Sequence, residues 1–311
     1  MNKKLLFLSL LIIVSIYGTS NTYAQTVKFH YSQSLIFLPI RINNVNLLFL
    51  LNTGANTTVI DKSIGDKLQL PVTRETDTVI GTAGKQHVAL VKIRTLSIGK
   101  TVIKDLVISK RNIGDFIRLN GQKIDGILGT DVLKNYALTI DYNTQKIAFQ
   151  SAKIPTGTKK SISFDMREGI PRFEVRLNDT LNTFLHFNSG VSLAPSKEVH
   201  VNISPKQWEK LKGFNPFLEH SKYLMGKGVG GGIYLQAVKI NRLELNHRVS
   251  IFNTYVIIQP KEGYFANDNA IGFFGNNLLE KYGRVSVDFI ARQVVLPVNV
   301  PAKKKKVVRK R

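Results

Sequence analysis

Residues 47–54 (LLFLLNTG) hold an apolar strand that stops abruptly at Asn-Thr-Gly, and residues 184–190 (FLHFNSG) repeat this pattern with Asn-Ser-Gly. A strand and a polar turn precede each copy, in residues 40–44 (IRINN) and 173–179 (FEVRLND). Asn and Gly are common in tight turns, but the same order in two places indicates an internal repeat. The period is far too long for a solenoid and predicts two homologous lobes.

A second pair of segments closes each copy of the repeat. Residues 125–129 (DGILG) and 271–275 (IGFFG) are followed by 132–136 (VLKNY) and 278–282 (LLEKY), then by strand-turn-strand patterns at 138–149 and 285–296. Alternating apolar and polar residues at 88–108 and 233–258 predict half-buried strands. Helices are expected to be few, one capped by Asp61 and running to Leu68, another starting at Ser204-Pro205 and running through Leu211. The sequence therefore predicts a mostly β architecture.

These elements resemble the duplicated active-site segments of pepsin-like and retropepsin-like aspartic proteases, over roughly residues 29–298, and are most similar to bacterial secreted members with short loops. The resemblance implies a bilobal, pepsin-like acid protease fold, with two homologous β-rich lobes and an interlobe cleft. It also implies that residues 127–129 and 273–275 support the two turns, and that the hydroxyls of Thr53 and Ser189 cross-link them.

The resemblance places Asn52 and Asn188 where the family carries its catalytic aspartates. The chemistry needs one ionised and one protonated carboxyl that share a proton. An Asn amide can donate a hydrogen bond but cannot accept a proton near neutral pH. We therefore expect an inactive homologue that binds an extended polypeptide in the cleft. The expected substrate-binding positions are Thr53, Gly54, Ser189, Gly190, the flap tip Gly81, Thr82, Ala83 and Gly84, and Gly228 and Gly230 in the second lobe.

Two alternatives remain open from the sequence. The chain is an active aspartic-type endopeptidase if Asn52 and Asn188 deamidate, or if His186, two residues before Asn188, acts as a base. A histidine hydrogen-bonded within the sheet is the simpler interpretation of His186. Asp61, Asp131 and Asp288 are expected to be structural, at a helix cap, a helix start and a strand end. The second alternative is a surface-attached structural protein that uses its basic tail.

Composition and charge set the remaining expectations. The chain has 44 Lys and Arg against 21 Asp and Glu, a formal net charge of +23, and no cysteine. Without cysteine there are no disulfides and a metal site is not expected, nor is a cofactor. We expect residues 1–24 to be an export signal peptide, which places the mature protein in the periplasm or outside the cell. The predicted organisation is an N-terminal lobe at 26–150, a linker at 151–160, a C-terminal lobe at 161–299 and a basic tail at 300–311.

The tail concentrates basic side chains, whose mutual repulsion predicts a disordered segment. Its alternative role is a tether to an anionic membrane or polysaccharide. No basic stripe interleaved with aromatics occurs in the chain, so specific nucleic-acid binding is not expected. The basic tail residues are Lys303, Lys304, Lys305, Lys306, Arg309, Lys310 and Arg311.

Overall fold

The computed structural model describes residues 26–81, 84–114, 117–157, 160–191, 198–218, 222–228 and 231–297. Within them, each half of the chain forms an eight-stranded sheet. The first sheet contains β2 (His30–Ser32), β3 (Leu35–Ile42), β4 (Val45–Leu51), β5 (Val59–Asp61), β6 (Val72–Gly81), β7 (Gly84–Ile98), β8 (Thr101–Arg111) and β11 (Gly126–Leu128). The second contains β15 (Asp165–Arg167), β16 (Ile170–Leu177), β17 (Leu181–Phe187), β18 (Val199–Ile203), β19 (Lys222–Gly228), β20 (Gly231–Leu245), β21 (Val249–Ile258) and β22 (Gly272–Phe274).

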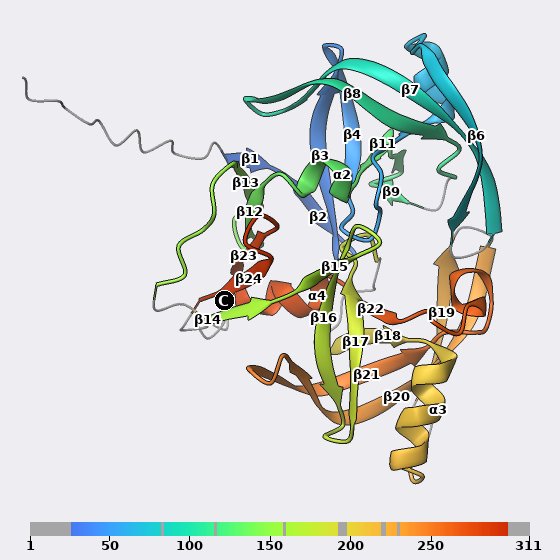
Figure 1. Cartoon of the computed structure of the whole chain (residues 1–311), viewed down its shortest axis with the longest axis vertical. Coiled ribbons are helices and arrows are strands. Elements are labelled where there is room, and N and C mark those ends of the chain that lie inside the picture. The colour runs from blue at the N-terminus through green and yellow to red at the C-terminus, as the bar shows by residue number, and fades with distance from the viewer. Residues whose placement is uncertain are drawn as a thin grey trace, which may run out of the picture.

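The two sheets have the same topology. The strand order is β2-β3-β4-β11-β5-β8-β7-β6 in the first and β15-β16-β17-β22-β18-β21-β20-β19 in the second. Extra β3–β7 and β16–β20 pairings curl each sheet upon itself. The hairpins β3–β4 and β16–β17 both turn on two consecutive residues with positive φ, Asn43-Asn44 and Asn178-Asp179, as two-residue hairpin turns require. The internal repeat and the mostly β fold are thus confirmed as two like lobes, at the top and bottom of Figure 1.

A third sheet joins the lobes, and the sequence did not reveal it. Its order is β1-β13-β12-β23-β24-β14, with three strands from each half of the chain. It lies at the left of Figure 1. Its strands are β1 (Thr26–Lys28), β12 (Ala137–Asp141), β13 (Lys146–Gln150), β14 (Lys160–Ser163), β23 (Arg284–Asp288) and β24 (Gln293–Leu296).

The register at the centre of the joining sheet defines a local dyad. Antiparallel β12 and β23 pair Leu138 with Val287 and Thr139 with Ser286. In the repeat, Thr139 and Ser286 are equivalent positions, so the axis relating the lobes passes between them. Their hydroxyl oxygens are 3.0 Å apart in a hydrogen bond. A symmetric register of this kind fixes one lobe against the other, because a slip by one residue would move every side chain of the strand to the opposite face of the sheet.

The apolar run of β4 lacks alternation because both faces of this strand are covered. Phe49 and Leu51 pack in the large core that spans both lobes, while Leu50 packs on the other face with a small cluster that includes Phe37 and Val59. In the second lobe, β17 places Leu185 and Phe187 in the large core. Both strands therefore reach the turn that follows them as rigid, doubly buried elements.

Helices are short and follow equivalent strands in the two lobes. The expected Asp61 cap is present, since Asp61 Oδ1 accepts from the Ser63 N–H at the start of α1. Ser204 caps α3 together with Gln207, and this helix runs three residues beyond the expected end at Leu211. The remaining short elements are β9 (Arg118–Leu119), β10 (Gln122–Lys123), α1 (Lys62–Lys67), α2 (Thr130–Leu133), α3 (Pro205–Phe214), α4 (Asn276–Leu279), η1 (Gly263–Ala266) and η2 (Glu280–Tyr282).

Several expectations fall outside the described residues: the signal peptide at 1–24, Thr82, Ala83 and Gly230, and the basic tail with its membrane role. In the predicted linker, the Ile154 N–H donates to Asp288 Oδ2 at 2.7 Å, and β14 begins at Lys160. Among the helices of the described part, none combines the length and apolarity needed to span a bilayer.

Because the joining sheet couples the lobes, a cavity on one side should destabilise both. Leu138 is fully buried in the common core, so Leu138→Ala should lower the free energy of unfolding by about 2–5 kcal/mol. The single tryptophan, Trp208, lies in α3 of the second lobe. In urea titrations of Leu138→Ala, the midpoint of the Trp208 fluorescence transition should fall together with the midpoint of the circular dichroism transition. Lys146→Ala, at an exposed position of the same sheet, is the control. A Trp208 transition left unmoved by Leu138→Ala would contradict the coupling.

Candidate functional site

The two Asn-(Thr/Ser)-Gly turns occupy equivalent places at the ends of β4 and β17. The Asn52 N–H donates to Leu128 O at 3.0 Å, and the Asn188 N–H donates to Phe274 O at 2.8 Å. These acceptors end β11 and β22, which run parallel to β4 and β17. Each turn is therefore held by the apolar segment that the sequence placed beside it.

Reciprocal hydrogen bonds join the turns across the dyad. The Thr53 N–H donates to Ser189 Oγ and the Ser189 N–H donates to Thr53 Oγ1, both at 2.9 Å. Each hydroxyl in turn donates into the opposite strand, Thr53 to Phe187 O at 2.7 Å and Ser189 to Leu51 O at 2.9 Å. Both side chains are buried. The structure thus brings the two turns into direct contact, and each hydroxyl both accepts one hydrogen bond and donates one.

Asn52 and Asn188 lie next to each other on this link. The Gly54 N–H donates to Asn52 Oδ1 at 2.8 Å, and the Gly190 N–H donates to Asn188 Oδ1 at 3.0 Å. A Cβ on Gly54 would overlap the Asn188 side chain, and one on Gly190 would overlap Asn52. Each amide therefore packs over the glycine of the opposite turn, which explains why both turns need glycine. Both asparagines are partly exposed.

A further pair of polar residues supports the turns, and the sequence analysis missed it. Thr130 Oγ1 donates to Gly169 O of the second lobe at 2.6 Å. Asn276, at the equivalent place, donates from Nδ2 to Ser34 O of the first lobe at 2.8 Å and to Ser189 O at 3.0 Å. The available signal was a polar residue directly after the glycine of both closing segments. These bonds add a second symmetric connection between the lobes.

Tyr142 and Tyr31 extend this support from the first lobe. The Tyr142 hydroxyl donates to Asn276 Oδ1 at 3.0 Å, and the Tyr31 hydroxyl donates to Glu280 Oε2 at 2.5 Å. Burial, and then the hydrogen bond to Glu280, raise the pKa of Tyr31. Burial likewise raises the pKa of Tyr142. Both phenols therefore remain protonated donors, and the Tyr142 hydroxyl holds Asn276 in place.

His186 is a buried sheet residue. Its Nδ1 lies 3.3 Å from Pro171 O, and the side chain is buried on the strand face opposite Leu185 and Phe187. Burial is the main cause that lowers its pKa, with Arg172 and Arg167 acting in the same direction while the Pro171 hydrogen bond and Glu168 oppose it. A neutral imidazole bonded to the backbone fits the simpler interpretation of this residue.

The three aspartates assigned to structure do hold backbone groups. Asp61 caps α1. Asp131 accepts from the Thr58 N–H at 2.8 Å and from the Thr58 hydroxyl at 2.7 Å. Asp288 accepts from the Ala291 and Ile154 N–H groups. Among the described residues, no carboxylate hydrogen-bonds to Asn52 or Asn188, and no cluster of three or more His, Cys, Asp or Glu could hold a metal ion.

The glycines expected at the flap tips close two long hairpins. Gly81 pairs with Gly84 at the end of β6–β7, and Gly228 pairs with Gly231 at the end of β19–β20. In Figure 1, β6 descends from the first lobe toward β19 of the second. β6 also contacts η1 of the second lobe. The hairpins thus reach toward each other across the lobe boundary.

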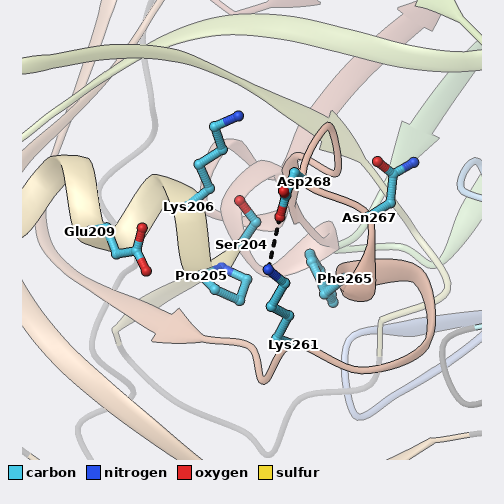
Figure 2. Close-up of a pocket in the computed structure, with 8 residues that line it drawn as sticks. All are labelled: Ser204, Pro205, Lys206, Glu209, Lys261, Phe265, Asn267 and Asp268. Carbon is cyan, nitrogen blue, oxygen red and sulfur yellow. Dashed lines mark ion pairs between the residues drawn. The ribbon is translucent and has the colours of Figure 1, made fainter.

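A separate hollow of about 210 Å³ lies in the second lobe beside the start of α3 and η1 (Figure 2), and neither Asn52 nor Asn188 lines it. Lys261 Nζ pairs with Asp268 at 3.1 Å across it. Lys206 and Glu209 of α3 add one charge of each sign. The charges therefore balance, and this hollow is not part of the site at the dyad.

Comparisons with known proteins agree with this fold. Residues 38–132 match the family described as aspartyl protease. The fold is similar to the crystal structure of an aspartic proteinase from Irpex lacteus, with a TM-score of 0.51 and 12% identity over 88% of this chain and 97% of that chain. No curated protein matches the sequence. The fold is therefore that of a pepsin-like aspartic proteinase, and the family match lies within the first half of the chain.

Removing the hydroxyl of Thr53 or Ser189 should leave buried N–H and C=O groups without hydrogen-bond partners. Thr53→Val and Ser189→Ala should each lower the free energy of unfolding by about 1–3 kcal/mol for each group left unpaired. The two substitutions remove different pairs of hydrogen bonds, so the double variant should be less stable than either single variant. Urea titrations of the singles and the double measure this, with the exposed Thr57→Val as control. Losses no larger than for Thr57→Val would refute the link.

The depressed pKa of His186 should appear in the pH dependence of stability. The unfolded chain takes up a proton near pH 6.5, whereas the folded protein resists protonation, so stability present above that pH is lost as the pH falls below it. His186→Leu, which introduces the residue found at the equivalent Leu50, should remove this part of the loss. Urea unfolding at about pH 7.5 and about pH 5 compares the two, and the exposed His30→Gln is the control. An unchanged acid loss in His186→Leu would overturn this assignment.

Proposed function

We propose that this protein binds an extended polypeptide at the Asn52–Asn188 turns and does not hydrolyse it. The observation that carries the proposal is an amide at both central positions of a site whose supporting bonds are otherwise complete. A site that had simply decayed would not be expected to keep four reciprocal cross-lobe bonds.

The absence of hydrolysis follows from the chemistry of the amide. Peptide hydrolysis on this fold needs a group that removes a proton from water and a second that protonates or polarises the carbonyl. An amide Nδ2 can polarise a carbonyl, but neither end of an amide accepts a proton near neutral pH. With both positions occupied by asparagine, the general base is missing.

The polypeptide ligand is inferred from the edges of the sheets. β6 and β19 are the last strands in their respective sheet orders, so each carries a row of backbone groups without a strand partner on one side. An extended chain pairs with such edges through its own backbone, and alternate side chains then face the protein. The glycines that close the two hairpins permit a close backbone approach.

The alternative, an active endopeptidase, rests on His186 or on deamidation. His186 is buried, is bonded to Pro171 O, and resists protonation. The Asn188-Ser189 peptide, a plausible deamidation sequence, lies in a turn whose N–H and hydroxyl are both fixed. These observations favour the non-catalytic proposal over the alternative.

The native protein should not cleave unfolded casein between acid and neutral pH. Asn52→Asp combined with Asn188→Asp should raise the cleavage rate in acid by at least about 10²-fold, because it restores the base and the acid. The matched control, Asn52→Ala with Asn188→Ala, should stay inactive. Intact mass, which rises with each deamidation, must be unchanged in the native sample. Cleavage by native protein of unchanged mass that a pepstatin-type inhibitor abolishes would refute the proposal.

A further inference from the structure

The two central amides have a fixed and identical orientation. Asn52 Oδ1 faces the Gly54 N–H and Asn188 Oδ1 faces the Gly190 N–H, at 2.8 and 3.0 Å. A backbone N–H can only donate, so turning either amide over would set two donors against each other. The carbonyl end of each side chain therefore faces its own turn, and each NH₂ group faces away from it.

Each NH₂ group lies against the glycine of the opposite turn and has no acceptor among the described residues. Each side chain packs over the glycine of the opposite turn, on either side of the dyad. Both residues are partly exposed, and among the described residues neither Nδ2 has a hydrogen-bond acceptor. The centre of the site is thus a pair of neutral donors related by two-fold symmetry, in place of the acceptors that carboxylates would supply.

We propose that the Asn52–Asn188 pair binds a carboxylate group, which the polypeptide of the proposed function carries. A carboxylate has two equivalent oxygens related by a two-fold axis, so each can accept from one Nδ2. Hydrogen bonds to an ionised acceptor are about twice as strong as those to a neutral one. A peptide carbonyl offers one neutral oxygen to the same two donors and is held more weakly.

Charge favours the same ligand. Without the two lysines of the expected signal peptide and the seven basic residues of the tail, the chain still carries a formal net charge of +14, and a positive field raises the local concentration of anions. No described carboxylate hydrogen-bonds to either amide, so no fixed negative group at the pair competes with the ligand. A pair of aspartates at these positions would repel the same ligand.

The test uses the full chain labelled with ¹⁵N-asparagine and titrated with sodium acetate, at ionic strength held constant with sodium chloride. The side-chain NH₂ signals are assigned by their loss in Asn52→Asp and Asn188→Asp. Acetate should move both signals together to saturation, and acetamide should bind at least about tenfold more weakly. Immobile signals, or equal affinity for acetate and acetamide, would overturn the inference.

Variants test whether the Nδ2 groups of Asn52 and Asn188, and not the residues around them, bind acetate. Asn52→Asp with Asn188→Asp should weaken acetate binding at least about tenfold, and Asn52→Ala with Asn188→Ala, which adds no charge, should weaken it to the same degree. Remaining signals near the turns report binding, and circular dichroism reports folding. Asn56→Asp, at an exposed neighbouring position, should leave acetate affinity within about twofold. Unchanged acetate affinity in the folded alanine variant would also overturn the inference.

Peptide probes distinguish this inference from the proposed function on which it rests. The probes are an acetylated and amidated valine peptide with a central aspartate, its asparagine counterpart, and a valine peptide with a free C-terminal carboxylate. Tighter binding of the first or the third shows which carboxylate is used. Equal binding of the aspartate and asparagine peptides, with no gain from the free carboxylate, refutes the carboxylate site but leaves polypeptide binding intact. Acetate binding without any peptide binding supports the carboxylate site and refutes polypeptide binding.

Discussion

The reciprocal bonding of Thr53 and Ser189 is the constraint on which the site depends. Each hydroxyl accepts from the opposite turn and donates into the opposite strand, so neither turn has its buried groups satisfied without the other. Leaving such a buried group without a partner costs about 1–3 kcal/mol, more than the roughly 1 kcal/mol that a hydrogen bond contributes. This asymmetry makes the arrangement of the two turns essentially all-or-none. This arrangement of the turns positions Asn52 and Asn188, because each residue directly follows a fixed strand and packs against the glycine of the opposite turn.

The joining sheet repeats the same symmetry at a distance from the site. Thr139 and Ser286 meet on the axis in the sheet, as Thr53 and Ser189 meet on it at the turns. Thr130 and Asn276 add bonds to Gly169 and Ser34 of the opposite lobes. These contacts all join equivalent positions of the two lobes about one axis. A movement of one lobe that kept one of these hydrogen bonds would therefore break the others. The lobes are therefore held in one relative placement by several symmetric contacts.

The sequence predicted the elements that a repeated local pattern encodes, and it failed where the decisive contacts are distant. The turns, the supporting segments, the alternating strands and the Asp61 and Ser204 caps all leave local signals. The joining sheet leaves none, because the pairing of Leu138 with Val287 depends on how the two halves dock. The end of α3 was placed too early because Asn215, which follows it, is fixed by Asn178 and Thr180 of a distant turn. Asn276 escaped notice because a single asparagine after a glycine resembles an ordinary turn residue.

The symmetric register at the β12–β23 contact has a consequence for how such a chain could arise. A strand that pairs antiparallel with its own counterpart about a dyad carries a self-complementary edge. One copy of the repeat, with β12 at its border, already presents the surface that a second identical copy would bind. Fusing two such copies through a short connection converts an association between molecules into one within a molecule, and frees each half to diverge in sequence. The present chain shows that divergence at this contact, with Thr139 on one side and Ser286 on the other.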